Sequence, residues 1–225
     1  MKTGLVIAID GPSGAGKSSS SRLLAERLAY RYVDTGALYR VIGLLALEQH
    51  VSPDDPQRVA ALCDNLALRF VANGTRVQLF VGERDITVAI RQPEVSQMAS
   101  KVSAHPAVRQ RLLSLQRELG RGGSVVMEGR DIGTVVFPDA GIKFYLDASA
   151  EERGRRRYVE LQQQGVDTTL EKTTQEMAER DGRDSQRQHA PLQRADDAIS
   201  IDTTALSLTE VVDLMVAHVE KARKC

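Results

Sequence analysis

A phosphate-binding loop constrains the fold of this chain more than any other feature of its sequence. Residues 11–18 read Gly-Pro-Ser-Gly-Ala-Gly-Lys-Ser, which matches the pattern G-x-x-x-x-G-K-[ST]. The apolar run 5–9 predicts a buried strand before the loop, and the leucine spacing over 19–30 predicts a helix after it. Glycines let successive backbone N–H groups face an anion, and a helix N-terminus adds partial positive charge. The alternative is a glycine-rich turn that only caps a helix, which the lysine and serine at the required positions disfavour.

Short apolar runs recur along the chain, separated by segments with helical spacing. The expected strands are residues 5–10, 32–33, 124–128, 142–146 and 198–202. The expected helices are residues 19–30, 35–49, 57–66, 94–103, 107–119, 150–164 and 168–188, with a final amphipathic helix after Ser207. Two capping boxes, Thr168 with Glu171 and Ser207 with Glu210, support the last two helices. This order predicts an α/β fold in which helices flank a parallel sheet on both faces.

Ligands bind such sheets beyond the carboxyl ends of the strands. Four segments follow expected strands, namely the phosphate-binding loop, residues 34–36, residues 129–131 and Asp147. Although these segments are remote in sequence, the sheet brings them to one edge. The sequence therefore predicts a single ligand site built from several loops.

Residues 63–98 differ in pattern from the rest of the chain. The runs 68–71 and 76–81 flank Asn73-Gly74, a strong signal for a hairpin with a type I′ turn, which needs positive φ at both central residues. An antiparallel hairpin among alternating strands and helices predicts an inserted subdomain at about residues 63–98.

Composition excludes several classes of partner. The chain has 225 residues with 30 basic and 30 acidic side chains, so no net field favours nucleic acid or an anionic membrane. No segment reaches the ~20 apolar residues of a membrane span. Cys63 and Cys225 match no metal spacing and favour a reducing compartment. We therefore expect a cytoplasmic protein with one domain that binds neither nucleic acid nor membrane.

Acids and hydroxyls near the expected loops are candidates for chemistry. Lys17 is the strongest candidate for a phosphate contact, and the hydroxyl of Ser18 or Ser19 for a magnesium contact. Glu128 and Asp131 lie at or just after an expected strand, where a carboxylate can hold hydrated magnesium. A loop salt bridge is an equally open interpretation of each acid.

Arginines are dense between residues 150 and 189, at positions 153, 155, 156, 157, 180, 183 and 187. On a helix, residues 180, 183, 184 and 187 share one face. Arginines gathered in this way repel one another unless an anion lies among them, and guanidinium groups suit phosphate. A solvated face with i, i+4 ion pairs is the alternative. No nucleophile–base pair is evident, which fits phosphoryl transfer, because that chemistry relies on positioning and charge neutralisation.

Five motifs now make a resemblance clear: IDGPSGAGK (9–17), DTGALYR (34–40), EGRDIGTVVFPDA (128–140), KFYLDAS (143–149) and ERDGRDSQR (179–187). Nearly end to end, the chain resembles the bacterial cytidylate (CMP) kinases of the nucleoside monophosphate kinase family. The resemblance implies a phosphotransferase that moves the γ-phosphoryl group of ATP to CMP or dCMP with Mg²⁺. It also implies a P-loop kinase core at about 1–62, 99–149 and 190–225, a nucleoside monophosphate-binding insert at about 63–98 and an arginine-rich helical lid at about 150–189.

The resemblance also implies roles for individual residues. Those matching the ATP site are Gly11, Pro12, Ser13, Gly14, Ala15, Gly16, Lys17, Ser18, Ser19, Arg153 and Arg157. Those matching the CMP site are Thr35, Arg40, Ser100, Arg109, Arg130, Asp131, Arg180, Asp184 and Arg187. The residues expected to act in catalysis are Lys17, Arg130, Arg156 and Arg187. The expected partners are ATP and CMP or dCMP, and we expect a monomer.

The chain departs from the family pattern at two places. The family commonly has Gly-Thr after the lysine, where this chain has Ser18-Ser19, and some relatives have Asp where this chain has Glu128. Two other functions remain open. One is a P-loop kinase for another acceptor, such as UMP or a small metabolite. The other is a nucleotide-dependent switch, although the chain lacks the guanine-reading N-K-x-D motif.

Overall fold

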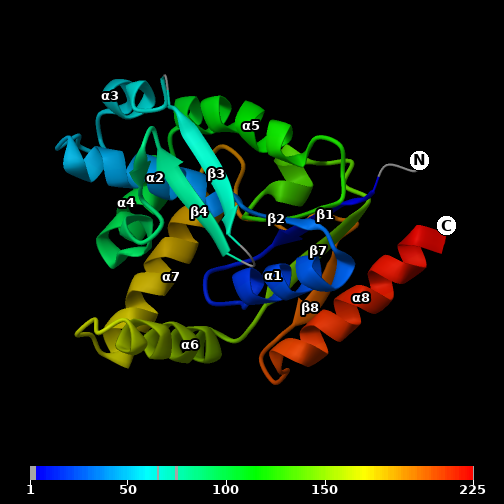
Figure 1. The fold of residues 1–225 in the computed structure, drawn as a ribbon. Coiled ribbons are helices and arrows are strands. Elements are labelled where there is room, and N and C mark those ends of the chain that lie inside the picture. Colours follow the sequence, from blue (N-terminus) through cyan, green and yellow to red (C-terminus); the bar gives the residue numbers. More distant parts are fainter. Residues whose placement is uncertain (1–3, 65, 74–75, 225) are drawn as a thin grey trace. The chain divides into compact units, whose positions relative to one another are not determined.

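The computed structural model describes residues 4–64, 66–73 and 76–224. The chain forms two compact units, one of Met1–Thr35 with Gln116–Cys225 and one of Gly36–Leu115 (Figure 1). The second unit covers more residues than the insert expected at residues 63–98. The boundaries of a nucleotide-binding insert therefore stay a prediction.

The first unit is built on a five-stranded parallel sheet with strand order β2-β6-β1-β7-β8. The strands are β1 (Val6–Asp10), β2 (Arg31–Asp34), β6 (Val125–Glu128), β7 (Ile142–Asp147) and β8 (Ile199–Asp202). Ile9 of β1 pairs with Glu128 on one side and Phe144 on the other. The segments after β1, β2, β6 and β7 thus meet at one edge of the sheet. The expected α/β fold with a parallel sheet flanked by helices is confirmed.

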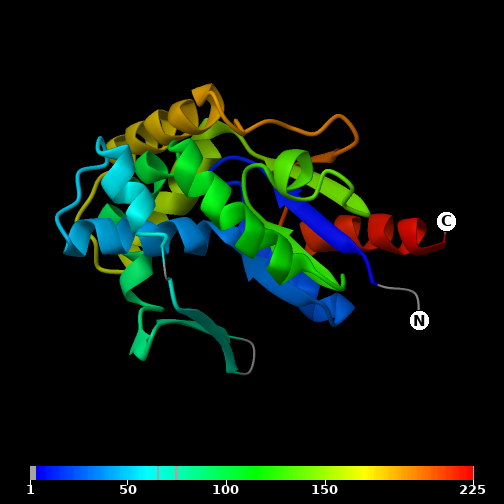
Figure 2. The ribbon, with the colours of Figure 1, turned by 90° about the horizontal axis from the view of Figure 1, so that it is seen from above.

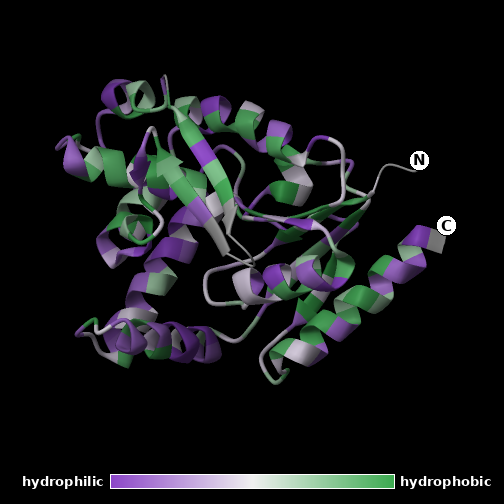
Figure 3. Cartoon of the chain, viewed as in Figure 1, coloured by the Kyte–Doolittle hydropathy of each residue, from purple (hydrophilic) through white to green (hydrophobic). Residues whose placement is uncertain are grey.

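Helices of the first unit are α1 (Lys17–Leu28), α6 (Ala150–Gln163), α7 (Leu170–Gln186) and α8 (Leu208–Lys224), with a π-helix η2 (Ile132–Val136). Helices α1 and α8 lie side by side in Figure 1, and Leu24 and Met215 pack with Ile7, Ile9 and Phe144 of the sheet. In contrast, α6 and α7 are largely hydrophilic (Figure 3). The buried faces of α1 and α8 therefore contribute to the core, whereas α6 and α7 carry mostly polar and charged residues.

The two predicted capping boxes have different outcomes. Ser207 accepts from the N–H of Glu210, whose carboxylate accepts from the Ser207 N–H at 2.8 Å, so this box is confirmed. The box at Thr168 is wrong. Thr169 is the N-cap of α7, and its hydroxyl accepts from the N–H of Lys172 at 3.2 Å. The Thr168 hydroxyl instead contacts the hydroxyl of Thr173.

The second unit contains a three-stranded antiparallel sheet with order β3-β4-β5, whose strands β3 and β4 run together in Figure 2. The strands are β3 (Leu68–Asn73), β4 (Arg76–Val81) and β5 (Arg84–Asp85). The pairing of Asn73 with Arg76 confirms the hairpin strands. The turn was predicted at Asn73-Gly74, and its placement of Asn73 is wrong, because Asn73 ends β3 and pairs with Arg76. Residues 74 and 75 lie outside the described residues. The short strand β5 was not expected.

Helices of this unit are α2 (Thr35–Glu48), α3 (Pro56–Ala61), η1 (Ala89–Arg91), α4 (Pro93–Val102) and α5 (Pro106–Gly120). Helix α3 starts as expected, because Asp55 caps it and Pro56 takes its first position. It ends at Ala61 rather than at residue 66. After it, the N–H groups of Cys63 and Asp64 donate to the carbonyl oxygens three residues earlier, which forms turns instead of further α-helix. Among the helices that the structure describes, we find none with both the length and the apolar character that a bilayer crossing requires.

Candidate active site

The phosphate-binding loop joins the end of β1 to the start of α1 along a path that needs glycine. Gly11 has a φ of 145°, and a Cβ atom there would lie 1.9 Å from the carbonyl oxygen of Leu146. Gly16 precedes α1 with a φ of 83°, and no described side chain caps this helix. The first N–H groups of α1 are thus available to an anion at the positive end of the helix dipole.

Lys17 is the first residue of α1 and is buried beside the loop. Its Nζ donates to the carbonyl oxygen of Pro12 at 2.5 Å. Burial, followed by the positive charge of Arg130, lowers the pKa of Lys17 to about 7. Because the two cations oppose each other, an anion arriving near them would favour the charged form of Lys17.

Glu128 ends β6 and is buried next to the loop. Its carboxylate accepts hydrogen bonds from the Ser18 hydroxyl at 3.0 Å and from the Tyr32 hydroxyl. Burial and the charge of Asp34 raise the pKa of Glu128, while Lys17 acts in the opposite direction. Hydroxyl and carboxylate oxygens are ligands that Mg²⁺ prefers, so Ser18 and Glu128 fit a hydrated magnesium ion at this place.

Thr35 connects the end of β2 to the segment that follows β6. Its hydroxyl donates to the carbonyl oxygen of Glu128 at 2.7 Å. A Cβ atom at Gly129 would lie 2.8 Å from that hydroxyl, so this close approach requires glycine. The contact fixes the start of the 129–131 segment against β2.

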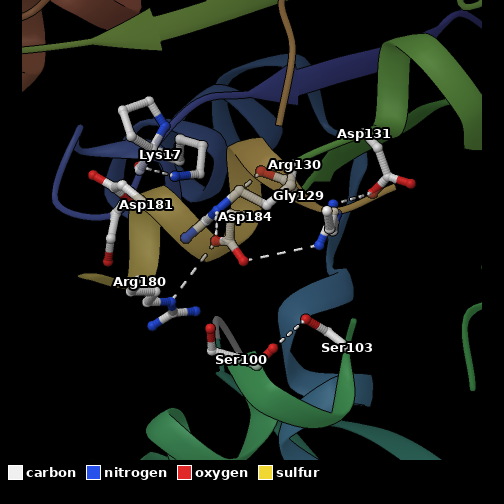
Figure 4. A network of polar contacts seen from close by, with 12 residues as sticks. Lys17, Ser100, Ser103, Gly129, Arg130, Asp131, Arg180, Asp181 and Asp184 are labelled. Atoms are coloured by element: carbon white, nitrogen blue, oxygen red, sulfur yellow. Dashed lines mark hydrogen bonds and ion pairs between the residues drawn. The ribbon is translucent and has the colours of Figure 1, made fainter. Parts of the chain in front are cut away.

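Asp184 of α7 lies among three arginines (Figure 4). Its Oδ2 accepts from Arg130 Nε at 3.0 Å and lies 3.9 Å from Arg180 Nε, and its Oδ1 lies 3.8 Å from Arg187 Nη1. Arg187 Nη2 lies 3.9 Å from Asp131 Oδ1. Burial acts to raise the pKa of Asp184, but the three guanidinium groups outweigh it and hold the pKa below its usual range. Three cations against two carboxylates leave a positive excess that suits a phosphate ester.

Helices α6 and α7 both hold the phosphate-binding loop through Arg153 and Asp181. Arg153 Nη1 donates to the carbonyl oxygen of Ser13 at 3.0 Å and pairs with the carboxylate of Asp181. The N–H of Ser13 donates to that same carboxylate at 3.2 Å. The side chain of Asp181 therefore takes a loop N–H group of the kind that binds phosphate.

The other two lid arginines have different surroundings. Arg156 donates to the hydroxyl of Thr203 at 2.9 Å and to its carbonyl oxygen at 2.7 Å, and the Thr203 hydroxyl donates to the loop carbonyl of Ala15 at 3.2 Å. Arg157 instead pairs with Glu160 of its own helix at 2.8 Å. Arg156 is thus linked to the loop, whereas Arg157 contacts its own helix.

The second unit holds the remaining predicted acceptor residues. Ser100 of α4 and Arg109 of α5 are buried. Ser103 connects them. Its hydroxyl donates to the Ser100 carbonyl at 2.8 Å (Figure 4), and its own carbonyl accepts from Arg109 at 3.3 Å. The Arg109 guanidinium lies 5.2 Å from the centre of the Tyr39 ring, and Arg40 is the next residue of α2. The unit thus brings Ser100 and Arg109 together.

Three residues near the loop were not expected from the sequence: Asp10, Asp181 and Thr203. An acid that ends an otherwise apolar buried strand needs buried partners, and this signal could have identified Asp10. Asp181 and Thr203 stand next to charged and polar neighbours, so no pattern distinguishes them.

Comparisons with known proteins show which family the sequence resembles. The sequence model of a family described as Cytidylate kinase matches residues 7–221. A cytidylate kinase of Geobacter sulfurreducens is 50% identical over 223 residues, covering 99% of this chain and 96% of that protein. A cytidylate kinase of Syntrophotalea carbinolica is 50% identical over 227 residues, covering 100% of this chain and 96% of that protein.

A similar arrangement also occurs among solved structures. The crystal structure of an uncharacterized protein from Eubacterium ventriosum has a TM-score of 0.51 and 13% identity, covering 96% of this chain and 98% of that chain. At this identity the similarity shows the fold alone.

Proposed function

The chain belongs to the cytidylate kinase family, and from that premise we propose how its residues transfer the γ-phosphoryl group of ATP to CMP or dCMP. The products are CDP or dCDP and ADP. One observation carries the residue-level proposal: within the first unit, the parallel pairing of Ile9 with Glu128 brings the phosphate-binding loop and the 129–131 segment to the same edge of the sheet. Cations proposed for the donor and for the acceptor phosphate therefore lie at one edge, where they can neutralise charge during phosphoryl transfer.

The donor site is the phosphate-binding loop. We assign the ATP phosphates to the loop backbone of residues 11–16, to Lys17, and to Ser18 and Ser19 at the start of α1. Arg153 and Arg157 of α6 complete the proposed donor site. The contacts of Arg153 with Ser13 support its assignment, whereas Arg157 rests on the family resemblance.

Mg²⁺ is the proposed cofactor. The hydroxyl of Ser18 or Ser19 and the carboxylate of Glu128 would hold the hydrated ion, in agreement with the hydrogen bond between Ser18 and Glu128. When bound, Mg²⁺ neutralises negative charge on the donor phosphates. Tyr32 holds the other oxygen of Glu128, and so fixes the direction of the carboxylate.

We propose that the acceptor binds to three groups of residues. Arg40, Arg130 and Arg187 hold the phosphate of CMP, while Arg180 and Asp184 contact the sugar. Asp131 and Arg109 read the base, assisted by Ser100. Thr35 supports residues 129–136, which we call the acceptor segment, through its hydrogen bond to the carbonyl oxygen of Glu128. A carboxylate facing the 4-amino group of cytosine and a guanidinium facing N3 would both be mismatched by uracil.

Catalysis then rests on charge neutralisation. Lys17, Arg130, Arg156 and Arg187 would surround the transferring phosphoryl group, and no protein nucleophile is needed. The lid of α6 and α7 excludes water, so that ATP is not hydrolysed. We further propose that the enzyme acts as a monomer in the cytoplasm.

A substrate panel tests the function. ADP release from ATP is measured with CMP, dCMP, UMP, AMP and GMP as acceptors. We expect CMP and dCMP to be good acceptors and UMP to have a kcat/KM lower by a factor of about 10² or more. Equal use of UMP would contradict base reading, and ADP release without any acceptor would favour a nucleotide switch.

A further inference from the structure

Asp10 is a charged residue in an apolar place. It ends β1, whose preceding residues Val6–Ile9 are apolar, and it is only 5% exposed. The next residue is Gly11, which begins the phosphate-binding loop. A buried carboxylate at this point needs strong hydrogen-bond donors.

The hydrogen-bond donors to Asp10 come from the acceptor segment and not from the phosphate-binding loop. The carboxylate of Asp10 accepts from the backbone N–H of Ile132 at 2.8 Å and from that of Gly133 at 2.7 Å. These are the first two residues of η2, whose N–H groups have no partner within the helix. Asp10 therefore caps η2 from a distant strand.

Asp131 stands at the position that normally caps a helix of this kind. Its φ of −147° and ψ of 26° place it at the N-cap of η2, yet its side chain makes no cap hydrogen bond. Its backbone carbonyl accepts from Val135 and Val136 at 2.9 and 3.1 Å. Because Asp10 supplies the cap, the carboxylate of Asp131 is directed to another partner, Arg187, at 3.9 Å.

We propose that Asp10 is a positioning residue that holds Asp131 in its base-reading orientation and ties the start of the phosphate-binding loop to the acceptor segment. Without this cap, the Asp131 carboxylate would turn to the free N–H groups of its own helix. The inference rests on the proposed role of Asp131 toward CMP.

The surroundings of Asp10 favour a fixed carboxylate. A Cβ atom at Gly133 would lie 3.4 Å from Asp10 Oδ2 and 3.1 Å from Lys143 Cδ, so the site is tightly packed. Asp131 is a nearby like charge, and Lys17 is a nearby opposite charge. Asp131 repels Asp10, and the two backbone hydrogen bonds hold the Asp10 carboxylate in place against this repulsion.

Asp10→Asn tests the proposal, because asparagine has the same shape but accepts at only one of the two terminal atoms. We expect kcat/KM for CMP to fall by roughly 10- to 100-fold, mainly through a higher KM. The ratio of kcat/KM for CMP to kcat/KM for UMP, called the CMP-to-UMP ratio, should also fall. KM for ATP should change by less than about threefold. The matched control is Asp55→Asn, which alters the cap of α3 and should leave all these values unchanged.

A second background separates positioning from general damage. In Asp131→Ala, a further Asp10→Asn change should not alter the CMP-to-UMP ratio. If Asp10→Asn does not fold, Gly133→Ala decides, because its added methyl group would lie 3.1 Å from Lys143 Cδ. This contact pushes the start of η2 away from the Asp10 carboxylate, and should also lower the ratio of kcat/KM for CMP to that for UMP.

Two negative results have different meanings. If the wild-type protein shows no preference for CMP over UMP, the proposed base reading fails. If the preference is present, the result for Asp10→Asn, or for Gly133→Ala in its place, decides. The positioning role of Asp10 is wrong if the variant leaves the CMP-to-UMP ratio and KM unchanged. It is also wrong if the variant lowers kcat/KM for CMP and for UMP equally.

Discussion

At the scale of single residues, buried charge controls the chemistry of the first unit. The pKa of Lys17 is lowered to about 7 by burial and Arg130, so at about pH 8 most free enzyme carries a neutral lysine. A bound triphosphate favours the charged form and raises this pKa. We expect ATP binding at about pH 8 to take up roughly half a proton or more, seen as a binding enthalpy that depends on the ionisation enthalpy of the buffer.

The control for this prediction is Lys17→Met, which should fold and show no buffer-dependent binding enthalpy. Its turnover should fall by a factor of at least about 10². An identical enthalpy in every buffer for the wild-type protein would mean that Lys17 is already charged in the free enzyme.

Asp184 gives a second prediction at this scale. Asp184→Asn leaves Arg130, Arg180 and Arg187 without their shared carboxylate, and should lower the free energy of unfolding by about 3 kcal/mol at pH 7. The pKa of Asp184 in the folded protein lies below its ordinary value of 3.8. The carboxylate therefore stabilises the fold above that pH, and its contribution is lost as pH falls through the lower folded pKa.

Urea unfolding of both proteins across pH measures this effect. The difference between wild type and variant should be largest near neutral pH and shrink below about pH 4. A difference that stays constant with pH would show that packing, and not charge, explains the loss.

At the scale of elements, helix α6 carries neighbouring arginines whose contacts differ. Arg155 and Arg156 both pair with Glu152 at 2.8 Å, but only Arg156 also reaches Thr203. We expect Arg156→Ala to lower kcat at least about tenfold, because it removes a cation linked to the phosphate-binding loop. Arg155→Ala, the matched control, should leave kcat within about twofold. Steady-state kinetics of the two variants decide, and equal losses would assign the effect to Glu152.

The elements also show how far local sequence rules extend. The parallel strands and most helices were predicted, because apolar runs and leucine spacing are local signals. The π-helix η2 was not, since its cap is supplied by Asp10 from a distant strand. Thr168 and Thr169 are both acceptable caps by type, and only the backbone at Thr169, with φ −113° and ψ 159°, selects one of them.

The candidate site was predicted in part for the same reason. The proximity of Arg130 and Asp184 follows from a sheet edge and a helix, which patterns reveal. Arg187 was expected on the same helix face, but it lies after α7 as the C-cap, in extended backbone. The hydrogen bond from the Ser13 N–H to the Asp181 carboxylate joins residues far apart in the sequence, so it depends on tertiary packing alone. Sequence patterns find such residues only when their neighbours are apolar, as they are for Asp10.

At the scale of the whole molecule, the proposed reading of the base includes Arg109, which belongs to the second unit. Arg109 and Arg111 lie on the same helix, but Arg109 is buried against Tyr39 while Arg111 pairs with Asp64 and is exposed. We expect Arg109→Ala to lower kcat/KM for CMP by about 10²-fold and to narrow the CMP-to-UMP ratio. Arg111→Ala should change neither value. A preserved ratio in Arg109→Ala would remove this residue from base reading.

The strand order has a consequence for how the chain acquires its structure. β1 leaves the ribosome before the other described strands, yet it is central in the sheet, and its neighbours β6 and β7 begin only at Val125 and Ile142. Until those strands are synthesised, Ile7 and Ile9 belong to an edge without a partner, which invites association between nascent chains. Such distant pairings slow folding. The nascent chain must therefore be shielded during much of its synthesis, and its yield should depend on chaperones more than its final stability would suggest.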